Sequence, residues 1–409
     1  MSSKGIKMIA VWCSSNAGSI RSLHLICLAF AGLLAGPARA QVNVPEGFEI
    51  VTFDRSPSLK VIPRINNCGQ IVYQDRNGDW DIMMYDNGRT VNVTDNDNWE
   101  GHAEINDLGD LIFTRGEGRN EPTTLYLRID GQEILFDENP GGFLGYVSNN
   151  AGHIAWSRGI SRSCPGASSI SYLWDGQRTI QISPTELYDQ GEAINEFDQV
   201  SYMHTDFCAD PWVGDIRLYS NGETIILPTQ ETRPVGTTIN DRGQVVWNTA
   251  RGLEIWNGRR TSLLVEGNLA SARINNRGDV YFARWDDGRS FWQPWLSIPS
   301  HNGRELHRLF EGDGHHGDGD VNDWGEVTWV SWDQMPANET QMWLMRRIRT
   351  ADSEFDDDVD LADAGALANC MTGPGRVDRL CDCRFLDLDH DGDVDLGDFA
   401  RFQNAFRAP

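Results

Sequence analysis

A short motif recurs seven times along the chain, and its spacing limits the possible folds more than any other feature. The motif has the form Ile-Asn-x-x-Gly-x-(Val/Ile)-x-(Trp/Phe), and its copies are anchored at Asn66, Asn106, Asn149, Asn195, Asn240, Asn275 and Asn322. The mean interval is about 43 residues, which matches a four-stranded propeller blade and is too long for one turn of a β-solenoid.

Each repeat carries the signals of two hairpins. Asn followed three residues later by Gly is typical of a type I turn, in which the Asn side chain folds back onto the backbone. Asp198 replaces this Gly in the fourth copy, and Asp also tolerates turn dihedrals. A second turn follows in the first six repeats, at Asn87-Gly88, Asp130-Gly131, Asp175-Gly176, Asn221-Gly222, Asn257-Gly258 and Asn302-Gly303. Two hairpins per repeat predict four strands.

The seventh repeat lacks the turn that would lead to a fourth strand. Its third strand is expected at residues 341–346, whereas an unassigned alternating run, residues 48–53, precedes the first repeat. Pairing these two segments would close the ring and remove its exposed edges. We therefore expect an all-β fold, a seven-bladed β-propeller over residues 41–349, with an open sandwich as the alternative.

Residues 1–40 have the features of a signal peptide. Lys4, Lys7 and Arg21 precede an apolar run, residues 23–34, that is too short for a permanent span, and small residues lie before Gln41 at the expected cleavage site. We expect a secreted, extracellular bacterial protein, with an uncleaved anchor as the alternative, and no further transmembrane segment. The formal charge of −25 disfavours nucleic acid and anionic membranes as partners.

The strongest local motif lies near the C-terminus. Asp387, Asp389, Asp391, Asp393, Asp395 and Asp398 occupy positions 1, 3, 5, 7, 9 and 12 of a twelve-residue loop, with Gly at position 6. This spacing directs oxygen ligands to one point, as Ca²⁺ requires. A weaker copy without the Gly lies upstream, at Asp352, Glu354, Asp356, Asp358, Asp360 and Asp363. An apolar helical face is expected after the second loop.

Two such loops, each followed by a helix and without a leading helix, resemble the type I dockerin repeat. Residues 391–396 and 358–363 carry the likeness. It implies a small α-helical calcium-binding module at residues 350–409 that docks onto a cohesin-like or cell-surface partner. The repeat region is also similar to secreted bacterial proteins with tandem NxxG repeats that end in interchangeable anchoring modules, which implies fold and export but no activity.

Six cysteines follow the predicted signal peptide, and an oxidising compartment favours disulfides. Cys164 and Cys208 occupy equivalent long loops of adjacent repeats and are expected to pair. Cys370 could pair with Cys381 or Cys383, whereas Cys68, in the first turn, has no evident partner.

The motif-end aromatics Phe113, Trp156, Trp247, Phe282 and Trp329 are expected to pack between blades. Other tryptophans are expected in irregular loops, where they are candidates for a binding face: Trp80, Trp99, Trp212, Trp285, Trp292, Trp295 and Trp332.

No nucleophile elbow, zinc-binding His-Glu-x-x-His or helix-opening phosphate loop is present. His315 and His316 lie among acidic residues, in a segment that we interpret as a solvated loop rather than a metal site. The residues expected to face the central channel, two positions before each anchor, are Arg64, Glu104, Val147, Ala193, Thr238, Arg273 and Asp320. Their opposite charges in adjacent blades are interpreted as charge-paired lining, with an acid and base pair for glycoside cleavage as the alternative.

Together these features favour a binding or adhesion protein whose propeller recognises an extracellular ligand, a glycan or a protein, and whose C-terminal module anchors it. Two alternatives stay open. One is a polysaccharide-degrading enzyme, a glycoside hydrolase or lyase, that carries a dockerin. The other is a cell-surface structural protein.

Overall fold

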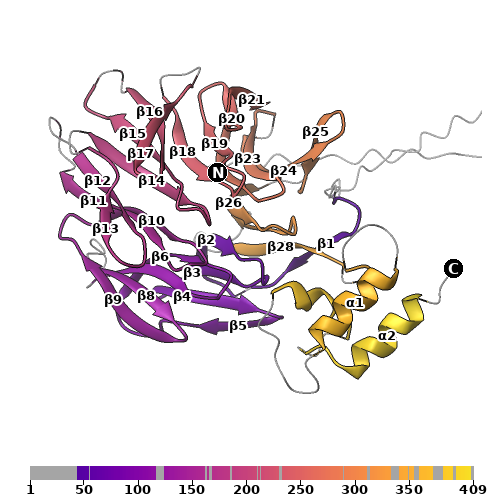
Figure 1. The fold of residues 1–409 in the computed structure, drawn as a ribbon. Coiled ribbons are helices and arrows are strands. Elements are labelled where there is room, and N and C mark those ends of the chain that lie inside the picture. Colours follow the sequence, from indigo (N-terminus) through magenta and orange to yellow (C-terminus); the bar gives the residue numbers. More distant parts are fainter. Residues whose placement is uncertain are drawn as a thin grey trace, which may run out of the picture. The chain divides into compact units, whose positions relative to one another are not determined.

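The computed structural model describes residues 44–409 except 55, 117–123, 162–163, 165–167, 185–186, 210, 212, 230–232, 289, 311–313, 333–339, 349, 354–358, 372–380, 390–392 and 407–409. The predicted signal peptide, residues 1–40, therefore lies outside the described residues. Within the described part, seven four-stranded antiparallel sheets follow one another along the chain (Figure 1). No helix of this part is long and apolar enough to cross a membrane.

Six blades are built from consecutive strands. Blade 1 contains β2 (Leu59–Ile65), β3 (Ile71–Asn77), β4 (Asp79–Asp86) and β5 (Arg89–Asn92). Blade 2 contains β6 (Trp99–Ile105), β7 (Leu111–Gly116), β8 (Thr124–Ile129) and β9 (Gln132–Glu138). Blade 3 contains β10 (Phe143–Ser148), β11 (Ile154–Ser161), β12 (Ser168–Trp174) and β13 (Thr179–Gln181). Blade 4 contains β14 (Tyr188–Ile194), β15 (Val200–Asp206), β16 (Val213–Ser220) and β17 (Glu223–Leu227). Blade 5 contains β18 (Val235–Ile239), β19 (Val245–Asn248), β20 (Gly252–Trp256) and β21 (Thr261–Glu266). Blade 6 contains β22 (Leu269–Ile274), β23 (Val280–Asp286), β24 (Phe291–Ser300) and β25 (Gly303–Arg308).

The seventh blade is completed by the N-terminal strand, as predicted. Its order is β1 (Phe48–Thr52), β28 (Gln341–Arg347), β27 (Val327–Trp332) and β26 (His315–Val321). β1 pairs antiparallel with β28, so that Phe48 lies opposite Arg347 and Thr52 opposite Trp343. The fold is therefore a seven-bladed β-propeller followed by a small helical module. The alternative of an open sandwich is wrong, because pairing of β1 with β28 joins the N-terminal strand to the last blade.

The turn chemistry agrees with the sequence. In the first motif the Asn66 side-chain oxygen accepts the backbone N–H of Gln70 at 2.9 Å, and Gly69 has a φ of 73°. Asp198, which replaces this Gly in blade 4, has a φ of 59°. The Asn-Gly and Asp-Gly turns join the third and fourth strands of blades 1 to 6. These are positions where a left-handed backbone favours Gly, Asn or Asp.

The anchor asparagines also form a ring that the sequence did not reveal. Each Nδ2 donates to the backbone carbonyl oxygen of the next anchor, at distances from 2.7 to 3.2 Å, and Asn322 of blade 7 donates to Asn66 of blade 1 at 3.1 Å. All seven side chains are buried. One residue type at one position therefore builds each turn and ties each blade to the next.

The aromatic predictions were correct for one set and wrong for the other. The motif-end aromatics are at most 2% exposed and pack between sheets, as expected. The remaining tryptophans were expected in irregular loops, but the described ones lie in strands and are half-buried. Trp285 and Trp292, for example, face each other across β23 and β24 with their ring centroids 5.3 Å apart. Trp212 lies outside the described residues.

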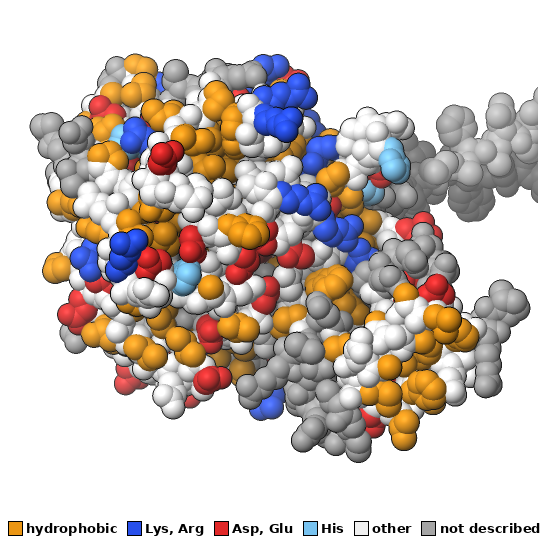
Figure 2. Space-filling model, in the orientation of Figure 1, with side chains coloured by type: hydrophobic (Ala, Val, Ile, Leu, Met, Phe, Trp, Pro, Cys, Tyr) orange, Lys and Arg blue, Asp and Glu red, His pale blue; other side chains and the backbone are white. Residues whose placement is uncertain are grey.

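The C-terminal module contains α1 (Leu361–Cys370), a short 3-10 helix η1 (Cys381–Phe385) and α2 (Leu396–Phe406). Its core includes Leu367, Leu386, Val394 and Phe402. Apolar side chains also gather on the outer surface of the two helices (Figure 2). The most exposed large apolar residues among the described residues of the module are Leu361 at 78% and Leu396 at 70%.

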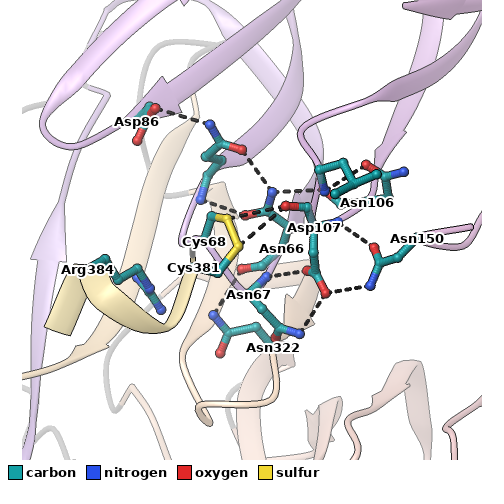
Figure 3. Close-up of a disulfide and its surroundings, with 12 residues drawn as sticks. Asn66, Asn67, Cys68, Asp86, Asn106, Asp107, Asn150, Asn322, Cys381 and Arg384 are labelled. Atoms are coloured by element: carbon teal, nitrogen blue, oxygen red, sulfur yellow. Dashed lines mark hydrogen bonds between the residues drawn. A yellow bond between two sulfur atoms is a disulfide. The ribbon is translucent and has the colours of Figure 1, made fainter. Parts of the chain in front are cut away.

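Three disulfides are present in the described part. Cys164 pairs with Cys208 as predicted, and Cys370 pairs with Cys383, one of the two expected partners. Cys68 pairs with Cys381, which links the first turn of blade 1 to η1 (Figure 3). Beside this bond Arg384 forms an ion pair with the buried Glu326, and the Phe385 ring lies 4.7 Å from that of Trp324. The tail is therefore fastened to blades 1 and 7.

Candidate functional site

A polar cavity of about 290 Å³ occupies the central channel. Its lining comes from the first strand of each blade. The seven residues predicted to face the channel all line it: Arg64, Glu104, Val147, Ala193, Thr238, Arg273 and Asp320. The cavity has a charged wall from blades 6, 7, 1 and 2, whereas the predicted channel residues of blades 3, 4 and 5 are uncharged.

The charged wall alternates in sign from blade to blade. Arg64 Nε donates to Glu104 Oε1 at 2.7 Å, and Arg273 Nε lies 3.9 Å from Asp320 Oδ1. The predicted pairs are therefore confirmed. Because blade 7 adjoins blade 1, they form one continuous row in the order Arg273, Asp320, Arg64, Glu104.

The two carboxyl groups of this row have pKa values shifted in opposite directions. Burial would raise the pKa of Glu104, but the guanidinium groups of Arg64 and Arg273 outweigh burial and lower it. For Asp320 burial dominates, and the pKa lies above its usual range despite the same two cations. The pKa of Arg273 is lowered, chiefly by the nearby charge of Arg64.

The wall from blades 3, 4 and 5 contains a buried acid that could not be singled out from the sequence. Glu192 on β14 is 8% exposed, and its Oε1 accepts hydrogen bonds from the hydroxyl groups of Ser157 and Ser171. Burial raises its pKa. Gly145, Gly191 and Gly236 line the same wall in three successive blades, each four residues before an anchor. The equal offset of these glycines was the available signal for an open wall.

A stacked pair of rings completes the cavity. The His102 imidazole lies 4.6 Å from the Tyr146 ring, and the Tyr146 hydroxyl donates to the His102 carbonyl oxygen at 2.5 Å. Burial lowers the pKa of His102 to about 4, and the charge of Glu104 opposes this only in part. His102 is therefore uncharged at neutral pH.

This imidazole should make stability depend on pH. Its pKa is about 4 in the folded chain and roughly 6.5 in the unfolded chain, so that the unfolded state binds more protons between these values. Stability is therefore lost as the pH falls through this window. The free energy of unfolding, measured with urea, should fall between pH 7 and about pH 4.5, and this fall should be about 1 kcal/mol smaller in His102→Gln than in wild type. The difference is kept this small because water in the channel screens the imidazole. His301→Gln, at an exposed histidine, should behave like wild type.

The channel end that carries the motif turns holds a second ring. At the position after each anchor, the backbone N–H donates to a side-chain oxygen of the next blade; this set is Asn67, Asp107, Asn150, Glu196, Asp241, Asn276 and Asp323. Asp107 also accepts the amides of Asn67 and Asn150, both at 2.9 Å (Figure 3). The four carboxylates of this ring are thus used to hold neighbouring blades together.

The second acidic loop brings predicted metal ligands together. Ligand oxygens of Asp387, Asp389 and Asp398 lie within 4.8 Å of one another, as do those of Asp393, Asp395 and Asp398. Asp398 also accepts the backbone N–H groups of Leu388 at 2.5 Å and Asp395 at 2.8 Å. This cluster of aspartates could hold a metal ion, and an all-oxygen donor set suits a hard cation. Asp391 lies outside the described residues.

The first acidic loop is described only at its ends. Asp363 accepts the backbone N–H of Ser353 at 2.6 Å and of Asp360 at 2.8 Å, and Asp360 caps α1. Asp352 is also described, whereas Glu354, Asp356 and Asp358 lie outside the described residues. Among the residues that are described here, no group of three ligands converges.

The expectation of a solvated loop at His315 and His316 was wrong. Both residues belong to β26, and His316 is fully buried. Its Nδ1 accepts the indole N–H of Trp329 at 3.2 Å, and the Phe310 ring lies 4.0 Å away. The strand begins earlier than the Gly-rich and Asp-rich sequence indicated, so that His316 belongs to the core of the last blade and His315 is half-buried beside it.

Comparison with known proteins supports the fold. No family model matches the sequence, and no curated protein matches it. The structure is similar to Pyrococcus horikoshii acylaminoacyl peptidase, with a TM-score of 0.54 and 12% identity over 74% of this chain and 54% of that one. It is also similar to the β-propeller domain of the Trilobed protease from Pyrococcus furiosus, with a TM-score of 0.51 and 13% identity over 72% and 96% of the two chains. The chain spans about half the length of the peptidase. That propeller domain has an open velcro topology, whereas here β1 and β28 pair.

Proposed function

We propose that this protein is a secreted binding protein that takes a small extracellular ligand into the central channel of its propeller, residues 41–349. The observation that carries the proposal is the cavity, in which buried polar groups converge from seven blades. Its volume of about 290 Å³ is near the lower end of the roughly 300–1,000 Å³ typical of small-molecule sites, so that the ligand should be small.

We assign the C-terminal residues 350–409 to a calcium-binding module of the dockerin type. The convergent aspartates around Asp398 support Ca²⁺ as the ion. Leu361 and Leu396 both occupy position 10 of their loops, where the helices begin, and both are strongly exposed, which supports docking of a cohesin-like or cell-surface partner on this surface.

Filling the cavity tests the binding function. A Cβ at Gly191 would meet no heavy atom within 4 Å, and its φ of 72° is one that Asn tolerates. In a thermal-shift screen of small extracellular metabolites, compounds that raise the melting temperature of wild type should have little effect on Gly191→Asn, since the new side chain would occupy ligand space. Gly222→Asn is the matched control, since Gly222 also has a positive φ and open space but lies in an outer turn. An equal response of both variants would contradict the proposal.

A specific observation favours glycoside hydrolysis as a second candidate function. Asp320 and Glu104 have pKa values raised and lowered, respectively, which is the separation that an acid and a base require. Release of reducing ends from a polysaccharide, abolished in Asp320→Asn without a change in the melting temperature, would establish this function. Without such release, the binding function stands alone.

A further inference from the structure

Resting on the proposed channel site, we infer that its ligand is a small neutral polyhydroxylated molecule, a monosaccharide or a cyclitol, and that Glu192 binds one of its hydroxyl groups.

Glu192 has one committed and one uncommitted oxygen. Its Oε1 accepts from two serine hydroxyl groups, but Oε2 is buried and has no hydrogen-bond partner among the described residues. A Cβ at the channel-lining Gly145 would lie only 2.3 Å from this oxygen. The carboxyl group thus lies directly against the glycine wall of the cavity. A buried polar atom is normally satisfied, and a ligand hydroxyl entering between the glycines would satisfy this one.

Arg273 has spare donors on the opposite wall. Its one hydrogen bond to the described part of the chain runs from Nη1 to the carbonyl oxygen of Ala272 at 3.2 Å, and 30% of its side chain is exposed. Arg64, in contrast, bonds both Glu104 and the carbonyl oxygen of Pro63 and is 9% exposed. Arg273 therefore offers several N–H groups toward the cavity, next to the carboxylate of Asp320.

The charge balance selects a neutral ligand. The charged wall contains two guanidinium groups and two carboxyl groups, and His102 is uncharged at pH 7. Burial raises the pKa of the third lining carboxyl group, that of Glu192, which favours its neutral form. A ligand with a net charge would be attracted by one kind of group in this row and repelled by the other. A hydroxyl group both donates and accepts, so that neighbouring hydroxyls can bond Arg273 and Asp320 together. Val147 and Ala193 provide an apolar surface for the C–H groups of a sugar ring.

Isothermal titration calorimetry with four classes of probe tests this inference. The neutral probes are D-glucose, D-galactose, D-mannose and myo-inositol; L-serine, L-lactate and putrescine represent zwitterions, anions and cations. At least one neutral probe should bind, and Arg273→Gln and Glu192→Gln should each weaken it roughly tenfold, since each removes a hydrogen bond involving a charged or acidic group. Arg346→Gln and Glu49→Gln, which alter an exposed ion pair outside the cavity, are the matched controls and should bind like wild type.

The outcomes separate the two proposals. Binding of L-serine, L-lactate or putrescine but of no neutral probe, lost in Gly191→Asn, would overturn the ligand class and keep the channel site. Binding of a neutral probe that is unchanged in both cavity variants would overturn the role of Glu192. Binding of no probe in any class would overturn both proposals. Thermal melts of Arg273→Gln and Glu192→Gln are the folding control: if their melting temperatures equal that of wild type, weaker binding is not caused by unfolding.

Discussion

A chain that begins at Arg55 is expected to aggregate or to melt about 10 °C or more below the full chain. Such a truncation removes β1 and leaves β28 as an unpaired edge. It also removes Phe48 and Ile50 from the core between blades 6 and 7, and Val51 and Phe53 from the core between blades 7 and 1. Each of these half-buried side chains contributes on the order of 1–2 kcal/mol, so that the loss is several kcal/mol.

The matched control is a chain that begins at Gln41, which keeps β1. Its melting temperature, followed by circular dichroism, should equal that of the full chain. If the chain from Arg55 stayed monomeric in size-exclusion chromatography with an unchanged melt, closure by the N-terminal strand would not hold the ring together.

The architecture could be predicted from the sequence because its signals are local. An Asn and a Gly three residues apart, or an adjacent Asn and Gly, specify a turn whatever the rest of the chain does. The strand that closes the ring could be identified by elimination, because residues 48–53 were an alternating run that belonged to none of the seven repeats. Pairing of β1 with β28 confirms that inference.

What could not be predicted depends on neighbours that are distant in sequence. Asn66 was correctly assigned to its turn, but its second role requires the carbonyl oxygen of Asn106 in the next blade. Cys68 had no evident partner because Cys381 lies 313 residues away. Glu192 is one of 60 acidic residues, and nothing in the sequence distinguishes it; only the structure shows that it is buried and accepts hydrogen bonds from two serines.

Strand ends were the other source of error. Trp285 and Trp292 lie near a hairpin tip, where Asp and Gly residues indicate irregular structure. Cross-strand contact of the two rings extends the pairing of β23 and β24 outward. Tertiary packing thus outweighed local sequence preference.

The C-terminal module should bind calcium, and removal of the calcium should weaken the contacts between this module and the propeller. η1 carries Cys381, Arg384 and Phe385, which contact blades 1 and 7, and it ends two residues before the predicted first ligand Asp387. Metal bound by the loop would therefore hold in place the segment that fastens the tail. Since ion binding to the folded state alone stabilises that state, chelation with EDTA should lower the melting temperature of the full chain.

Replacement of Asp398 is the sharpest form of this prediction, because this carboxylate belongs to both groups of convergent ligands. Asp398→Asn keeps its size but removes a charge that balances the cation, so that calorimetric titration of the full chain with CaCl₂ should lose the heat of the second loop. EDTA should then shift the melt of this variant less than that of wild type. Asp287→Asn, at an exposed carboxylate outside the tail, is the matched control and should retain the full heat. If Asp398→Asn bound calcium as wild type does, the convergent aspartates would not be the calcium site.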